Sequence, residues 1–404
     1  MPSNPGSRRD FLKWLALSPV LTQAGALVAG EDPAASDSLI TSPEQALDVL
    51  EFEPVARQAL PPAHFAYLAT GVDDDAIIEA NRAGFAHWQI RSRRLIDVSH
   101  VEQSVQLFGT TWTSPIVIAP VSSQRAFHPE GEVATARAAR AREHLQILST
   151  GSTTSIEEVT EARGAPVWYQ LYPTNNWAVG RSLIKRAEAA GSPVLVLTVD
   201  LHENSNRETL FRSRRVDTRD CEACHQTGLI SSVQRKPMFD GLDLTGVTTL
   251  IASDQTWDVI KRIRDATSMK LVIKGIVTRE DAELAAGHGV DGLIVSNHGG
   301  RSENSNRATI DCLAEVIEGA GPHIPVLVDS GFRRGTDIFK ALALGARAVC
   351  IGRPYLWGLA AFGQPGVEKV LEILRRELLT IMRQAGTTSI AAITRSSVAG
   401  PTQN

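Results

Sequence analysis

The chain has 404 residues, of which 43% are hydrophobic and 21% are charged. This balance is typical of a soluble globular protein with one large barrel or two ordinary domains. Its net charge of -4 at pH 7 gives no reason to expect a nucleic-acid partner, because nucleic-acid binding needs a basic surface. We therefore expect small molecules or other proteins as partners.

The N-terminal segment has the features of an export signal. Residues 7–13 read Ser-Arg-Arg-Asp-Phe-Leu-Lys, a twin-arginine motif, and a modestly apolar run follows over residues 14–29. We predict that residues 1–30 direct export of the folded protein to the periplasm and that residues 31–42 form a linker. The alternative is a chance arginine pair before a short amphipathic helix.

Residues 43–81 are predicted to be helical, and eight short apolar runs then alternate with amphipathic segments. Such alternation is typical of parallel strands joined by helices. The predicted strands are 116–119, 146–149, 167–170, 194–199, 271–273, 292–295, 326–328 and 348–351. The predicted helices between them include 131–144, 181–190, 257–266, 279–287 and 336–344. We expect an α/β fold, a closed (β/α)8 TIM barrel over residues 43–404, with a doubly wound open sheet as the alternative.

Residues 209–256, after the fourth predicted strand, are too long for an ordinary connection and are interpreted as a lid or partner-facing excursion. They contain Cys221, Cys224 and His225 in a CxxCH sequence, the attachment pattern of haem c. A local disulfide, a metal site or a chance match would also explain it, and the excursion leaves no room for a packed cytochrome domain. Cys312 and Cys350 are expected to be core thiols.

Polar residues follow almost every predicted strand. Barrel enzymes carry their chemistry at the C-terminal ends of the strands, so these side chains are expected to face one mouth. They are Pro120, Ser149, Gln170 with Tyr172, Thr198 with Asp200, Lys274, His298 with Arg301, Asp329 with Arg333, and Gly352 with Arg353. Polar residues after one or two strands would be usual for turns. Polar residues after almost every strand predict an active site.

Residues 294–301 are the most informative of these segments. Their apolar run ends at His298, which can titrate near neutral pH, and Arg301 follows after two glycines that let the backbone approach a ligand. A histidine alone would suggest a core residue, and an arginine alone a surface ion pair. Together they indicate a base beside an anion clamp.

The chain resembles the family of FMN-dependent 2-hydroxy acid oxidases and dehydrogenases, which includes glycolate oxidase, lactate oxidase, mandelate dehydrogenase and the flavin domain of flavocytochrome b2. The resemblance covers the chain from about residue 43 onward and rests on residues 118–120, 128–131, 197–200, 273–275, 294–301 and 333–337. It implies an FMN cofactor, oxidation of an (S)-2-hydroxy acid to the 2-oxo acid, and an electron carrier or oxygen as acceptor. It also implies a homo-oligomer, a tetramer or larger.

The resemblance assigns roles at the substrate. His298 resembles the catalytic base, Asp200 the carboxylate that orients it, and Tyr172 a hydrogen-bond partner of the substrate hydroxyl. A planar guanidinium matches the two oxygens of a carboxylate. The groups implied to hold the substrate carboxylate are Tyr67, Arg207 and Arg301.

The resemblance also assigns the cofactor site. The residues implied to contact the flavin ring are Pro120, Val121, Ser122, Ser149, Gln170, Thr198, Lys274 and Ser296. Lys274 would favour electron acceptance by the flavin, and a structural salt bridge is its alternative. The loops after the last two strands commonly bind phosphate in barrels. The residues implied there are Asp329, Gly331, Arg333, Gly352 and Arg353.

The sequence departs from the family pattern at three places. Residues 201–206 differ from the usual run before the substrate arginine, Ser330 replaces a glycine, and Gly151 replaces the tryptophan of glycolate oxidase. The last change enlarges the pocket unless Phe127 or Trp112 refills it, so the identity of the acid stays open.

We predict an enzyme that acts on CH-OH donors, and two alternatives stay open. The first is an oxygen-dependent oxidase or monooxygenase on the same barrel. The second is a flavin-retaining barrel that only binds a ligand. The retained His298 argues against the second alternative, because a binding protein would not need a base.

Overall fold

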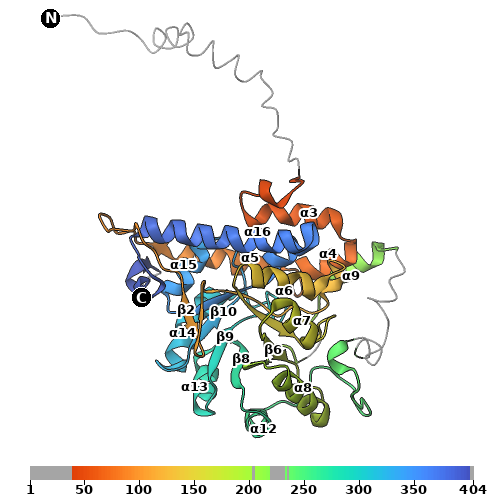
Figure 1. Ribbon diagram of the computed structural model, residues 1–404. Helices are drawn as coiled ribbons and strands as arrows, with labels where there is room; N and C mark the ends of the chain where they lie inside the picture. Colours follow the sequence, from red (N-terminus) through yellow and green to blue (C-terminus); the bar gives the residue numbers. More distant parts are fainter. Residues whose placement is uncertain (1–38, 203–204, 219–232, 234–235, 401–404) are drawn as a thin grey trace, which may run out of the picture. The chain divides into compact units, whose positions relative to one another are not determined.

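The computed structural model describes residues 39–202, 205–218, 233 and 236–400, and all of them except Leu39 belong to the unit Ile40–Asn404. Its centre is a closed barrel in which the strands follow the order β10, β11, β4, β5, β6, β7, β8 and β9 (Figure 1). The first barrel strand, β4, pairs in parallel with the last, β11, and this pairing closes the ring. The predicted (β/α)8 barrel is confirmed, and the open-sheet alternative is wrong.

The barrel strands lie within a few residues of their predicted positions. They are β4 (Ile116–Ile118), β5 (Leu145–Ser149), β6 (Trp168–Leu171), β7 (Val194–Thr198), β8 (Lys270–Ile276), β9 (Gly292–Val295), β10 (Val326–Val328) and β11 (Ala348–Ile351). Apart from β8, all their residues are buried. Helices cover the outer face of these strands and side chains fill the inside, which explains their continuous apolar sequence. β8 is longer than predicted, because a register shift between Lys274 and Ile276 extends it.

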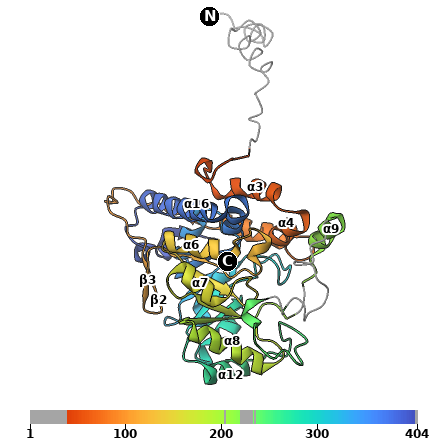
Figure 2. The same cartoon turned by 45° about the vertical axis from the view of Figure 1, so that its right-hand side comes forward.

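Helices surround the barrel, and Figure 2 shows α6, α7, α8 and α12 following one another along its outside. They are α6 (Gly131–Ala141), α7 (Ile156–Arg163), α8 (Trp177–Ala189), α12 (Asp258–Ala266), α13 (Arg279–Gly287), α14 (Thr309–Ala320), α15 (Gly335–Ala343) and α16 (Arg353–Ala385). α8 begins four residues before its predicted start, because the side chain of Asn176 caps it by accepting from the backbone of Ala178. α16 is interrupted by non-helical backbone at Phe362 and Gly363.

The predicted helical extension before the barrel is also present. It consists of α3 (Phe52–Ala59), α4 (Pro62–Ala69) and α5 (Ala76–Ala83), with short 3-10 helices at Pro43–Gln45, Val49–Glu51 and Gly84–His87. α3 packs against α16, and α4 packs against α9 (Glu208–Val216). The extension therefore meets the barrel beside the segment that follows β7.

Two small antiparallel pairs flank the barrel and were not predicted. β1 (Gln89–Ile90) pairs with β12 (Val398–Ala399), and β2 (Val105–Leu107) pairs with β3 (Thr110–Trp112). Leu107, Phe108 and Trp112 of the second pair pack on the cluster that fills the barrel interior, where Phe108 contacts the ring of Trp168 at 5.4 Å between centroids. This hairpin therefore closes the barrel core at the amino ends of the strands.

The predicted excursion of residues 209–256 is described in part. It contains most of α9 and a 3-10 helix at Pro237–Phe239, in which Met238 and Phe239 are buried. Further short helices of the described chain are Gln124–Ala126, Ile390–Ala392 and Arg395–Ser397.

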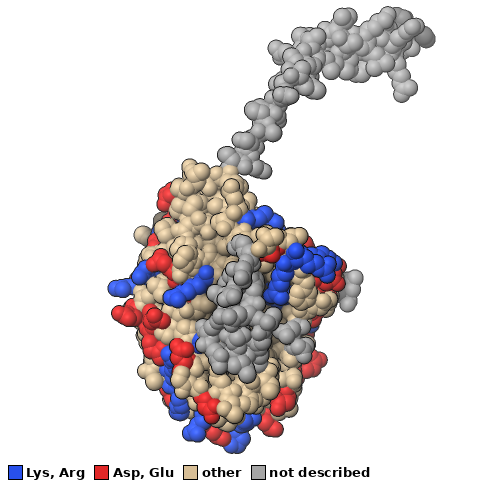
Figure 3. Space-filling view, turned by 90° about the vertical axis from the view of Figure 1, so that its right-hand side faces the viewer, with Lys and Arg blue, Asp and Glu red and all other residues tan. Residues whose placement is uncertain are grey.

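The surface carries both signs of charge. On the face that Figure 3 shows, basic and acidic side chains are interspersed. Within the described part of the chain, no helix has both the length and the apolar character needed to cross a membrane. Cys312 in α14 and Cys350 in β11 are free and buried, which confirms their prediction as core thiols.

Candidate active site

A cavity of about 570 Å³ is lined by the residues that follow the barrel strands. The predicted site residues in its lining are Tyr67, Pro120, Val121, Ser122, Ser149, Tyr172, Arg207, Lys274, His298, Arg301, Asp329, Gly331, Arg333, Gly352 and Arg353. The other predicted residues lie beneath this lining, and each is bonded to or paired with one of its members. They are Gln170 beside Ser149, Thr198 and Ser296 beside Lys274, and Asp200 beside His298.

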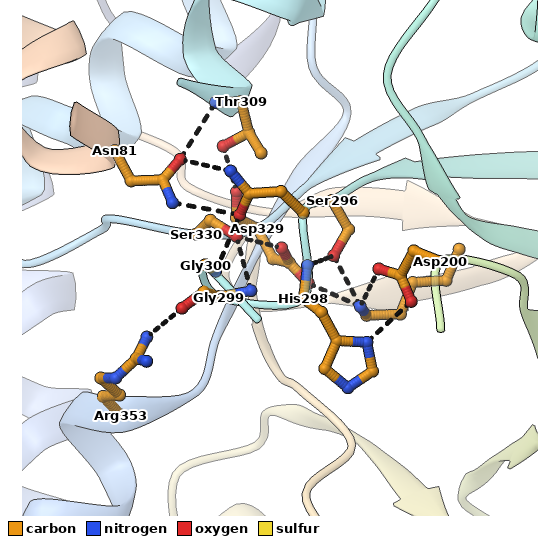
Figure 4. Close-up of polar contacts among 12 residues, drawn as sticks. Asn81, Asp200, Ser296, His298, Gly299, Gly300, Thr309, Asp329, Ser330 and Arg353 are labelled. Carbon is orange, nitrogen blue, oxygen red and sulfur yellow. Dashed lines mark hydrogen bonds and ion pairs between the residues drawn. The ribbon is translucent and has the colours of Figure 1, made fainter. Parts of the chain in front are cut away.

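His298 lies between a carboxylate and a phenol. Its Nδ1 is 2.7 Å from Oδ1 of Asp200, as Figure 4 shows, and its Nε2 is 3.1 Å from the hydroxyl of Tyr172. Burial lowers the pKa of His298 below its ordinary value of 6.5, although the negative charge of Asp200 opposes this shift. Burial and the Asp200 charge raise the pKa of Tyr172, so its hydroxyl keeps its proton. The imidazole is therefore neutral at neutral pH and presents Nε2 to the cavity side.

The turn that carries His298 has an unusual backbone. His298, Gly299 and Gly300 all have positive φ, of 59°, 68° and 81°, a conformation that costs about 1–2 kcal/mol for a residue with a side chain. The side chain of Asn297 accepts a hydrogen bond from the Gly300 amide at 3.0 Å. Asn297 in turn exchanges two amide hydrogen bonds, of 3.0 and 2.9 Å, with Asn81 of α5 (Figure 4). The turn is thus held from outside the barrel.

Asn81 and Asn297 were missed from the sequence. Asn297 adjoins His298 and carried a weak local signal, since asparagine favours turns. Asn81 carried none, because its partner lies 216 residues away along the chain.

Lys274 is the buried cation at the centre of the site. Its Nζ donates to Ser296 Oγ at 2.6 Å and lies 3.2 Å from Asp329 and 3.6 Å from Asp200. Burial alone would lower the pKa of Lys274, but the two carboxylates outweigh it and raise that pKa above 10.5. Burial likewise favours a raised pKa for Asp200, but His298 and Lys274 lower it to about 2. Both partners are therefore charged at neutral pH.

Arg207 and Arg301 lie together over the ring of Tyr67, with their guanidinium carbons 5.0 and 5.3 Å from its centroid. Both side chains donate to the backbone carbonyl of Tyr67, at 2.6 and 2.7 Å. Burial, and then the charge of Arg301, lower the pKa of Arg207 to about 9. Burial also lowers the pKa of Arg301. Two buried like charges of this kind form a site for an anion.

A second pair of arginines lies after β10 and β11. Arg333 stacks over Trp357 at 4.7 Å and Arg353 donates to Gly299 O at 2.7 Å, a contact that Figure 4 shows. Burial lowers the pKa of both, that of Arg333 to about 10. Within the described ranges, neither they nor Arg207 and Arg301 form an ion pair with a carboxylate.

The loops beside Arg333 and Arg353 leave room for a phosphate. Gly331 has a φ of 84°, and apart from Gly352 and its two chain neighbours no heavy atom of the described chain lies within 4 Å of where a Cβ of Gly352 would be. Ser330, which replaces the family's glycine, also has a positive φ of 76°. Its hydroxyl donates to Asp329 at 2.7 Å and accepts from the Gly299 amide at 3.1 Å, so it joins this loop to the His298 turn.

The residues beneath the cavity fit a flavin ring. Among the described residues, the side-chain nitrogen of Gln170 and the hydroxyl of Thr198 are buried without a hydrogen-bond partner. Unsatisfied buried polar atoms cost about 1–3 kcal/mol each, which indicates that a polar ligand completes them. Lys274 offers its positive charge in the same region, paired across the strands with Thr198. These donors match the polar edge of an isoalloxazine, so the site fits FMN.

Gly151 lies directly against Ser122. A Cβ at position 151 would come 2.6 Å from Ser122 Oγ, which itself lies 3.0 Å from Ser149 Oγ. Trp112 lies in the hairpin at the opposite end of the barrel, so it does not refill this space. Phe127 stacks on Tyr67 with ring centroids 6.2 Å apart. The pocket wall at Gly151 is therefore small and polar.

Comparison with known proteins gives close relatives over nearly the whole chain. A peroxisomal (S)-2-hydroxyacid oxidase of Arabidopsis thaliana is 39% identical over 355 residues, which is 88% of this chain and 97% of that protein. Glycolate oxidase 3 of Oryza sativa subsp. indica is 40% identical over 363 residues, 87% of this chain and 95% of that protein.

These relatives contradict the predicted periplasmic location, because the matched hydroxy-acid oxidases include proteins named as peroxisomal. The predicted export through the twin-arginine route is wrong with it, because an arginine pair before a modestly apolar run is a short pattern that other N-terminal segments also satisfy. The assignment of residues 1–30 and 31–42 to a signal and a linker stays a prediction. Residues 1–38 lie outside the described residues, as do Cys221, Cys224 and His225. The comparisons give haem c no support, since the matching family is described by FMN alone.

Solved structures agree with the sequence comparison. A lactate oxidase of Pediococcus acidilactici superposes with a TM-score of 0.80 at 34% identity, covering 88% of this chain and 95% of its own. An (S)-mandelate dehydrogenase of Pseudomonas putida gives a TM-score of 0.80 at 32% identity, covering 88% and 99%. The family model described as FMN-dependent dehydrogenase matches residues 56–400. The chain therefore belongs to the family of FMN-dependent 2-hydroxy acid oxidases and dehydrogenases, which oxidise hydroxy acids to oxo acids.

Proposed function

We propose that this enzyme oxidises (S)-2-hydroxy acids with an apolar side chain, that His298 is its base, and that oxygen is its electron acceptor. The observation that carries the proposal is the chain of contacts Tyr172–His298–Asp200, which borders the same cavity as two arginines that pair with no carboxylate among the described residues. A base beside an anion clamp is what removal of a proton from a bound hydroxy acid requires.

His298 receives a proton from the substrate on Nε2. Asp200 accepts a hydrogen bond from Nδ1, which leaves Nε2 without a proton and stabilises the imidazolium that forms. The Tyr172 hydroxyl lies beside Nε2 of His298, where it can donate a hydrogen bond to the substrate oxygen. This arrangement serves proton removal from either the hydroxyl or the α-carbon.

Arg207 and Arg301 bind the substrate carboxylate, and Tyr67 lies beside them. Burial disfavours the charged form of both guanidinium groups, as their lowered pKa values show. A bound anion between them stabilises that charged form. Fixing the carboxylate places the neighbouring carbon at a set distance from Nε2 of His298. FMN, when bound, accepts the two electrons that leave this carbon, and Lys274 holds positive charge close to its ring.

Beside Ser205, Arg207, Arg214 and Lys236, the segments after β7 contribute six apolar residues to the cavity lining. They are Leu201, Leu210, Phe211, Phe239, Leu250 and Ile251. A hydrophobic lining binds apolar side chains in preference to polar ones. This lining supports a substrate larger and more apolar than glycolate.

The names of the relatives support oxygen as the acceptor, since the Arabidopsis, rice and Pediococcus proteins are oxidases. The alternative is an electron carrier, which the dehydrogenase among the solved structures favours. Measuring oxygen uptake with and without a soluble one-electron acceptor separates the two. The family resemblance also leads us to propose a homo-oligomer, a tetramer or larger, which light scattering would test.

We expect flavin reduction by hydroxy acids in the absence of oxygen. Anaerobic mixing of the FMN-loaded protein with (S)-2-hydroxy acids of increasing apolar side chain should bleach the flavin absorbance, fastest with the larger members. The (R)-acids are the control and should leave the spectrum unchanged. If no member of the panel bleached the flavin, the protein would be the ligand-binding barrel instead.

The rate of flavin reduction should depend on pH through His298. Only the neutral imidazole accepts a proton, and burial lowers its pKa below 6.5. The rate should therefore stay level from pH 8 to about pH 6.5 and fall as the pH drops through the lowered pKa. Stopped-flow absorbance measures this profile, and a midpoint above 6.5 would contradict the proposed environment of the base.

A further inference from the structure

The C-terminal end of α4 binds three arginines. The carbonyl oxygens of residues 66, 67, 68 and 70 accept hydrogen bonds from Arg207, Arg301 and Arg353. A helix C-terminus carries a partial negative charge on these carbonyls. This partial charge stabilises the positive guanidinium groups, which form no ion pair within the described residues. One short helix outside the barrel thus supports both the substrate arginines and a phosphate arginine.

Thr70, directly after this helix, accepts hydrogen bonds from two of the three arginines, through its hydroxyl as well as its carbonyl. Its hydroxyl donates to Ala66 O at 2.6 Å and accepts from a terminal nitrogen of Arg207 at 2.9 Å. Its carbonyl accepts from the same nitrogen of Arg207 at 3.2 Å and from Arg353 at 3.1 Å. Thr70 is 5% exposed, so water does not replace these contacts.

We propose that Thr70 is a positioning residue for substrate binding, because its hydroxyl fixes the guanidinium of Arg207 in the orientation that receives the substrate carboxylate. This inference rests on the proposed function in assigning the carboxylate to Arg207. The side chain of Thr70 does not line the cavity, so it acts through Arg207 and not on the substrate. Arg353 contacts only backbone oxygens at this helix end, so a change of the Thr70 side chain leaves its partners in place.

Three substitutions test the proposal. Thr70→Val removes the hydroxyl with little change of shape, and Thr70→Ser keeps it. Thr387→Val is a matched control, because Thr387 is also buried after a helix and its hydroxyl donates to the carbonyl of Met382, away from the cavity. Each FMN-loaded variant is examined for KM, kcat and FMN affinity, and for binding of pyruvate, a non-reducing 2-oxo acid, by calorimetry.

A hydrogen bond to a charged group contributes enough to change an equilibrium about 10-fold. For Thr70→Val we expect KM and the Kd of pyruvate to rise about 10-fold, with kcat and FMN affinity unchanged. Thr70→Ser should restore both constants, and Thr387→Val should leave them at the wild-type values. Unchanged binding in Thr70→Val, or a serine variant as weak as the valine variant, would overturn the proposal.

The pyruvate measurement separates this inference from the proposed function. If none of the hydroxy acids reduced the flavin of the wild-type protein, the proposed reaction would be wrong. Weaker pyruvate binding in Thr70→Val, restored in Thr70→Ser, would still support the positioning of Arg207.

Discussion

Replacing His298 should lower the rate of flavin reduction by about 10²–10⁴-fold, which is the usual contribution of a positioned base. Asparagine is the variant of choice, because residue 298 has a φ of 59° and asparagine adopts this region more readily than alanine. The FMN content and the yellow colour should not change, since the residues fitted to the flavin ring and phosphate are untouched. Anaerobic stopped-flow absorbance measures the rate.

His288→Asn serves as the control for this experiment. His288 is exposed at the end of α13 and stacks on Trp257, so its replacement should leave the rate at the wild-type value. His298→Ala should lose at least as much activity as His298→Asn. Reduction of His298→Asn at the wild-type rate would show that the base lies elsewhere.

Lys274→Met should lower both the free energy of unfolding and the rate of flavin reduction. The ammonium group is 3.2 Å from Asp329 and 3.6 Å from Asp200, so its removal leaves buried carboxylates without their cation. Breaking a buried pair from one side costs about 3–5 kcal/mol of unfolding free energy. Flavin reduction should also fall about 10²–10³-fold, as when a positioned electrostatic group is lost. Urea unfolding with excess FMN measures the first effect and stopped-flow absorbance the second.

The stability loss in Lys274→Met should depend on pH. Lys274 helps lower the pKa of Asp200 to about 2, so in the wild type this carboxylate contributes stability that is present above pH 3.8 and is lost as the pH falls toward 2. Without the ammonium group the folded-state pKa of Asp200 rises, and less of this stability remains. The difference between variant and wild type should therefore be larger at pH 5 than at pH 3.

Lys270→Met provides the comparison on the same strand. Lys270 lies at the exposed start of β8, where its side chain is 56% exposed and pairs with Asp291 at 2.9 Å. Exposed pairs contribute about 0–1 kcal/mol, so this variant should unfold close to the wild type. Equal unfolding of Lys274→Met and Lys270→Met would mean that the buried ammonium group does not hold the carboxylates.

The sequence determined the barrel because each barrel strand is buried on both faces. A short run such as Val194–Thr198 has only apolar residues before its polar end, and that pattern is visible without knowledge of its neighbours. The residues at the strand ends, such as His298 and Lys274, were found for the same reason. The carboxyl ends of parallel strands must meet at one mouth, so their position along the chain predicts their position in space.

The tertiary structure alone decided what supports these residues. Asn81 and Thr70 belong to the helical extension, and they hold the His298 turn and Arg207 through contacts that span 216 and 137 residues of sequence. No periodicity or motif records such contacts, because they depend on where α4 and α5 pack against the barrel. The sequence thus determined the barrel and the chemical groups at its mouth, since both follow from local pattern. The orientation of those groups comes from packing between distant segments, which only the folded structure contains.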